Sequence, residues 1–96
     1  MTEHHIKYKV IGTIKRVKGV CPIGHKVGEI FEVSSYSSGG LCGFFYHDIY
    51  PYIVMLQFGG SLPKEWGPEG WKGDVITLDC MDIVNAVRIE LRREEI

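Results

Sequence analysis

The feature that most constrains this chain is the two-residue alternation of apolar and polar side chains near both of its ends. In residues 6–18, IKYKVIGTIKRVK, the apolar residues on one parity are Ile6, Tyr8, Val10 and Ile14. The lysines on the other parity are Lys7, Lys9 and Lys15. This period predicts a strand with one buried and one solvated face. Gly12 indicates a bulge or a close backbone approach within it, and the parity changes at Val17.

Three more segments have the composition of strands. Residues 27–34, VGEIFEVS, place Phe31 and Val33 on one face and predict a strand antiparallel to the first. Residues 74–80, DVITLDC, and 85–93, NAVRIELRR, carry alternating β-branched residues, with a turn between them. The chain therefore has a strand pair at each end.

The middle of the chain has helical periodicity instead. Between residues 41 and 58 the large apolar side chains recur at helical spacing, as Phe45, Ile49, Tyr52 or Ile53, and Leu56. Pro51 lacks an N–H and clashes with the preceding turn, so either two short helices meet at Tyr50-Pro51 or one helix is kinked there. Gly59-Gly60 is expected to end the helix.

These segments predict an α+β fold of two antiparallel β-hairpins (β-β-α-β-β) packed against a Pro-broken apolar helix. At 96 residues the chain is expected to form a single domain over 1–96. Its apolar fraction of 45% and charged fraction of 24% are those of an ordinary globular protein. Exposed strand edges in such a sheet could pair two copies into a homodimer.

Charge and hydropathy exclude several classes of partner. A net charge of -1 gives no field that attracts nucleic acid, and no apolar run reaches the length of about 20 residues that a membrane helix needs. The N-terminus has no apolar signal-peptide core, so we expect a cytoplasmic protein. Three cysteines, an odd number, then indicate free thiols or metal ligands rather than disulfides.

The residues with metal-ligand chemistry are Cys21, His25, Cys42 and Cys80. Each lies at the end of a predicted element, and such ends can meet at one edge of a small fold. Three thiolates and one imidazole form the closed tetrahedral site that zinc prefers, and they favour zinc or iron over magnesium or calcium. The other interpretation is that the cysteines are small buried apolar residues and that His25 caps its turn.

A different chemistry is also open for Cys42. In GGLCGFF, residues 39–45, this cysteine begins the predicted helix, where unpaired N–H groups stabilise a thiolate. With His25 or His47 in reach it would be a nucleophile or a redox thiol. No acidic residue that would orient the histidine is recognisable from the sequence.

The loop at residues 59–73 is a further candidate for binding. Trp66 and Trp71 lie in it among glycines, prolines and charged residues. They are candidate anchors for a protein or small-molecule partner, or else they cover the core of the domain.

Several motifs resemble those of a family of uncharacterised small prokaryotic proteins of about this length. The family has a C-P-x-G-H-K-x-G-[DE]-x-F segment, then G-G-L-C, Y-P, F-G-G and a late C-P-D. The matching residues are 21–31, 39–42, 50–51, 58–60 and 80–82, with Met81 in place of the last proline. The resemblance implies a shared site at Cys21, His25, Cys42 and Cys80, and it leaves metal binding, redox chemistry and packing open.

Overall fold

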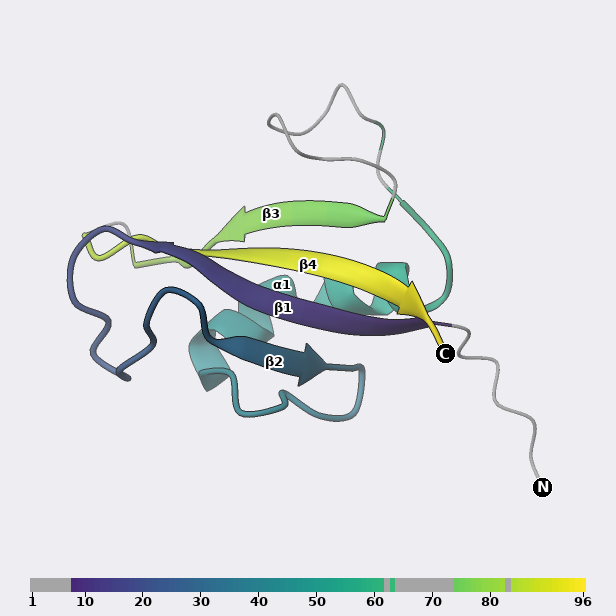
Figure 1. Cartoon of the computed structure of the whole chain (residues 1–96), viewed down its shortest axis with the longest axis horizontal. Coiled ribbons are helices and arrows are strands. Elements are labelled where there is room, and N and C mark those ends of the chain that lie inside the picture. Colours follow the sequence, from purple (N-terminus) through teal and green to yellow (C-terminus); the bar gives the residue numbers. More distant parts are fainter. Residues whose placement is uncertain (1–7, 62, 64–73, 83) are drawn as a thin grey trace.

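The computed structural model describes residues 8–61, 63, 74–82 and 84–96. These residues form four strands and one helix, in the predicted order β-β-α-β-β. The elements are β1 (Tyr8–Val17), β2 (Ile30–Val33), α1 (Gly43–Gln57), β3 (Val75–Asp79) and β4 (Val87–Glu95). Figure 1 shows one sheet with α1 lying against one of its faces, which confirms the predicted α+β class.

The sheet is antiparallel and has the order β2-β1-β4-β3. Both predicted hairpin partners pair, β1 with β2 and β3 with β4. The first and last strands also pair, from Tyr8 opposite Glu95 to Val17 opposite Val87. The central β1–β4 pair therefore joins the two hairpins into one sheet, a link that the alternation pattern does not predict.

The alternation of β1 produces the predicted buried face. Val10 and Ile14 are fully buried. Gly12 is a close backbone approach, because a Cβ at this position would lie 2.8 Å from Cδ1 of Ile89 on β4. The bulge lies further on, between Ile14 and Arg16, where the register with β4 shifts. This shift explains why the parity changes at Val17.

The middle segment forms a single helix with Pro51 inside it, so the alternative of two separate helices is wrong. Its buried apolar residues, which follow the predicted spacing, are Phe45, Ile49, Ile53 and Leu56. The helix ends as expected at Gly59-Gly60. Gly59 has a φ of 88°, its N–H donates to the carbonyl of Leu56, and the Gly60 N–H donates to the carbonyl of Met55 at 2.8 Å. This pair of bonds is a Schellman motif.

The core lies between α1 and the central strands. Buried side chains of α1 join one apolar cluster with those of the two central strands, among them Val10, Ile14, Val87, Ile89 and Leu91. Within the described residues, no helix has the length and apolar character needed to cross a membrane. Trp66 and Trp71 lie outside the described residues, as does most of the predicted 59–73 loop.

Candidate functional site: a three-cysteine pocket

Three chain segments meet at one edge of the molecule and bring the cysteines together. Cys21 follows β1, Cys42 is the N-cap of α1, and Cys80 follows β3. In Figure 1 the end of β1, the end of β3 and the beginning of β4 lie together at the left of the view. All three cysteines line one pocket of about 280 Å³. We call this site the three-cysteine pocket.

The wall of the three-cysteine pocket is mostly apolar. Besides the cysteines, it is lined by Pro22, Ile23, Phe44, Met81, Asp82 and Val87. Three of these side chains are exposed at its rim, Ile23 by 61%, Phe44 by 70% and Met81 by 63%. Cys21 is buried, whereas Cys42 and Cys80 are half-buried, and all three are free thiols. Solvent and ligands therefore have access to sulfur from the rim.

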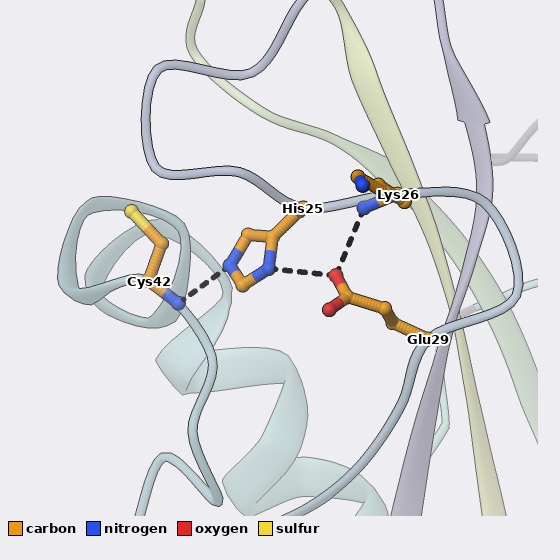
Figure 2. Close-up of polar contacts among 4 residues, drawn as sticks. All are labelled: His25, Lys26, Glu29 and Cys42. Atoms are coloured by element: carbon orange, nitrogen blue, oxygen red, sulfur yellow. Dashed lines mark hydrogen bonds and ion pairs between the residues drawn. The ribbon is translucent and has the colours of Figure 1, made fainter.

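His25 lies beside the pocket, and its two ring nitrogens bond a backbone N–H and a carboxylate. Its ring is buried, with 7% of the side chain exposed. Nε2 accepts a hydrogen bond from the backbone N–H of Cys42 at 3.0 Å, and Nδ1 lies 3.0 Å from Oε1 of Glu29. An N–H can only donate, so Nε2 carries the lone pair and Nδ1 carries the proton that it donates to the carboxylate. Figure 2 shows the Cys42 sulfur turned away from the imidazole.

Glu29 is the orienting acid that sequence reasoning did not find. Its Oε1 also accepts the backbone N–H of Lys26 at 2.9 Å. This bond, followed by the hydrogen bond from His25, holds the pKa of the Glu29 carboxyl below its ordinary value. In the sequence, Glu29 stands four residues after His25 in HKVGE. The two side chains meet only because the chain turns at Gly28, whose φ is 95°.

The turn that carries His25 and Glu29 is joined to β1 by backbone hydrogen bonds. The Ile14 N–H donates to the carbonyl of Glu29, and the Gly28 N–H donates to the carbonyl of Ile14, both at 2.9 Å. The rings of His25 and Phe31 of β2 pack in a T-shaped arrangement, with centroids 5.1 Å apart. These contacts fix the imidazole, and through it the beginning of α1 at Cys42.

The turn after β3 directs a backbone donor at sulfur. The N–H of Asp82 points to Sγ of Cys80 at 3.5 Å. The carboxylate of Asp82 accepts the backbone N–H groups of Val84 and Asn85 and the side-chain amide of Asn85. The Asn85 side chain, followed by the backbone donors, lowers the pKa of Asp82. An N–H directed at sulfur stabilises the charge of a thiolate.

Asn85 connects two of the segments that carry cysteines. Its Oδ1 accepts the N–H of Val20 at 3.0 Å, next to Cys21. Its carbonyl accepts the N–H groups of Lys18 and Gly19. These hydrogen bonds therefore hold the segment before Cys21 against the turn after Cys80. Sequence reasoning did not assign this role to Asn85.

The residues predicted as metal ligands thus divide into two groups. The structure brings Cys21, Cys42 and Cys80 to one pocket and places His25 behind the backbone of Cys42. Among the described residues, no group of three or more His, Cys, Asp or Glu side chains is arranged to hold a metal ion. Comparisons with protein families, curated proteins and solved structures find no match. The family resemblance therefore stays a prediction.

Proposed function

We propose that this protein is a small metal-binding domain whose site is the three-cysteine pocket. The observation that supports it is that all three cysteines of the chain, at positions 21, 42 and 80, line the same cavity. The cysteines also pack as small apolar side chains, Cys21 within the core cluster and Cys42 and Cys80 against it, but the pocket that they share leaves room for a ligand beside all three. The backbone N–H of Asp82 directed at the sulfur of Cys80 adds to this argument, because it fixes the geometry of the turn that carries this thiol.

The ligands in this proposal are thiolates, which favour zinc or iron among common protein metals. His25 was predicted as a fourth ligand, but both of its ring nitrogens have partners in the fold. We therefore give His25 a positioning role: it holds the backbone at Cys42 while the thiol of Cys42 faces the pocket. As a ligand it would have to release either the Cys42 N–H or Glu29.

Binding requires the sulfurs to move closer together. A pocket of about 280 Å³ is much larger than one ion. Each cysteine has a single side-chain torsion before its sulfur, and rotation between its staggered positions relocates Sγ without changing the backbone. Binding then releases the thiol protons to solvent, so affinity should rise with pH.

Alkylation of the thiols tests the proposal. We would incubate the full chain with iodoacetamide at pH 7, with and without one equivalent of Zn(II), Fe(II) or Cu(I) under anaerobic conditions. Mass spectrometry then gives the labelling rate of each cysteine. One of the metals should slow the labelling of all three cysteines together, at one ion per chain. Labelling that no metal changes would contradict the proposal.

Single serine variants assign the ligands. Cys21→Ser, Cys42→Ser and Cys80→Ser should each remove protection of the two remaining thiols. Asp48→Asn is the matched control, because Asp48 lies near Cys42 in the adjoining pocket and is absent from the three-cysteine pocket. It should keep full protection, and a loss equal to that of the serine variants would mean that the metal lies elsewhere.

The alternative function, thiol chemistry at Cys42, is supported by the position of this residue. Cys42 is half-buried at the N-cap of α1 and lines both the three-cysteine pocket and the adjoining pocket, although its side chain makes no capping hydrogen bond to the helix. His25 does not take the thiol proton in this structure, since its Nε2 accepts the backbone N–H. The same labelling experiment distinguishes the two functions. A redox thiol would label at Cys42 far faster than at Cys21 and Cys80, with or without metal.

A further inference from the structure

Met81 places a further sulfur at the three-cysteine pocket. It follows Cys80 directly, and its side chain lines both this pocket and the adjoining pocket beside Cys42 and His47. It is 63% exposed, so it contributes little to the apolar core. An exposed methionine at the rim of a thiol pocket is well placed to act as a thioether ligand.

The nitrogen and oxygen groups of His25 and Asp82 are already occupied, and His47 and Asp48 line the adjoining pocket but not the three-cysteine pocket. The two ring nitrogens of His25 contact Cys42 and Glu29. The carboxylate of Asp82, which also lines the pocket, accepts three N–H donors from Val84 and Asn85. The pocket therefore offers sulfur from four side chains, three thiols and one thioether, within apolar walls.

Sulfur-only sites discriminate among metals. Thiolates alone suit zinc, iron and Cu(I), and the soft thioether of a methionine is the ligand that shifts the preference to Cu(I). Zinc also requires four ligands for a closed site, and a thioether is a poor fourth ligand for it. We propose that the metal of this pocket is monovalent copper, bound by the thiolates of Cys21, Cys42 and Cys80 with Met81 as an additional thioether ligand. This inference rests on the proposed metal-binding function.

The test compares Met81→Leu with Met55→Leu in the full chain. Both substitutions remove one thioether and keep the apolar volume, and Met55 lies on α1, away from the pocket lining. Cu(I) affinity would be measured anaerobically by competition with bicinchoninate, and Zn(II) affinity by competition with a chromophoric chelator. Met81→Leu should weaken Cu(I) about tenfold, which corresponds to ~1.4 kcal/mol, and leave Zn(II) unchanged. Met55→Leu should change neither affinity.

X-ray absorption at the copper edge provides a second measurement. The wild-type protein should show only sulfur neighbours around one Cu(I) per chain. A nitrogen or oxygen neighbour, an unchanged Cu(I) affinity in Met81→Leu, or an equal loss of Cu(I) and Zn(II) affinity would overturn the copper assignment. The proposed metal site would survive each of these outcomes. If no metal binds or slows alkylation, the proposed function itself fails, and the copper assignment fails with it.

Discussion

Two regions of this molecule, the core between α1 and the sheet and the three-cysteine pocket, are stabilised by different interactions. Between α1 and the central strands, side chains such as Ile53, Leu56 and Leu91 are fully buried and pack through apolar contact. At the three-cysteine pocket, apolar side chains are exposed and the segments are fastened by hydrogen bonds of His25 and Asn85. Burial fixes the fold at the core, which includes Cys21 and Val87 of the pocket wall, whereas individual hydrogen bonds fix the segments at the pocket rim. Substitutions at the pocket should therefore alter the site without unfolding the domain.

The largest expected effect comes from the same substitution made in the two regions. Ile53→Ala removes a fully buried side chain of α1 and should lower the free energy of unfolding by about 2–5 kcal/mol, because it leaves a cavity. Ile23→Ala removes a side chain that is 61% exposed at the pocket rim and should cost roughly 0.5 kcal/mol or less. Urea unfolding followed by circular dichroism measures both. Equal losses would mean that the two regions are not stabilised differently.

The next effect concerns the contact between His25 and the beginning of α1. His25→Ala leaves the Cys42 N–H without its acceptor in a partly buried place, so stability should fall by about 1–3 kcal/mol. Hydrogen exchange of the Cys42 amide should accelerate more than that of amides in β1 and β4. The control is His47→Ala, since the His47 side chain is 89% exposed, and its effect should stay within roughly 0.5 kcal/mol. An unchanged Cys42 exchange rate would contradict this role for His25.

A smaller effect is expected at Asn85. Asn85→Ala removes the acceptor of the Val20 N–H and the side-chain donor to Asp82, and each such bond is worth about 1 kcal/mol net. Because these bonds join the segments of Cys21 and Cys80, alkylation of both thiols in the metal-free protein should become faster. Labelling of Cys42 should change less, since His25 holds its segment. A uniform change at all three cysteines would indicate loosening of the whole fold instead.

Much of the fold could be predicted from the sequence, because burial in a sheet has a period of two and burial on a helix a period near 3.6. That is why the parity of Val10 and Ile14 and the spacing of Phe45 and Ile49 identify core residues correctly. The β1–β4 pairing was not predictable in this way, since it joins the two ends of the chain and no local pattern encodes it.

The candidate site was predictable in part, because its cysteines lie at the ends of elements that the periodicity identifies. Cysteines at the ends of elements could be expected to meet, and the structure places them at one pocket. The orientation of His25 could not be expected, because it depends on a left-handed glycine at position 28 and on a backbone N–H from another segment. Nearly every residue type has a backbone N–H, so the sequence does not show which one a side chain will contact.

The smallest expected effect is the dependence of stability on pH, and it also separates the two regions. The pKa of Glu29 is lowered from its ordinary value of 4.5, first by the Lys26 N–H and then by His25. A carboxyl with a lower pKa in the folded state stabilises the fold above its unfolded value, and this contribution is lost as the pH falls through the folded value. Wild-type stability should therefore decline below about pH 4.5.

Two amide variants locate this acid dependence. Glu29→Gln keeps an oxygen acceptor for Lys26 and His25 but cannot titrate. The free energy of unfolding of this variant should therefore fall less steeply than that of the wild type as the pH is lowered below 4.5. Asp79→Asn is the matched control on the sheet, where Arg88 lowers the pKa of Asp79 from 3.8. It should flatten the decline at lower pH than Glu29→Gln does, because an aspartate begins from a lower unfolded value. If Glu29→Gln retains the wild-type slope, the Glu29 carboxylate does not stabilise the pocket end through its charge. The His25–Glu29 hydrogen bond would then position the ring without contributing to the dependence of stability on pH.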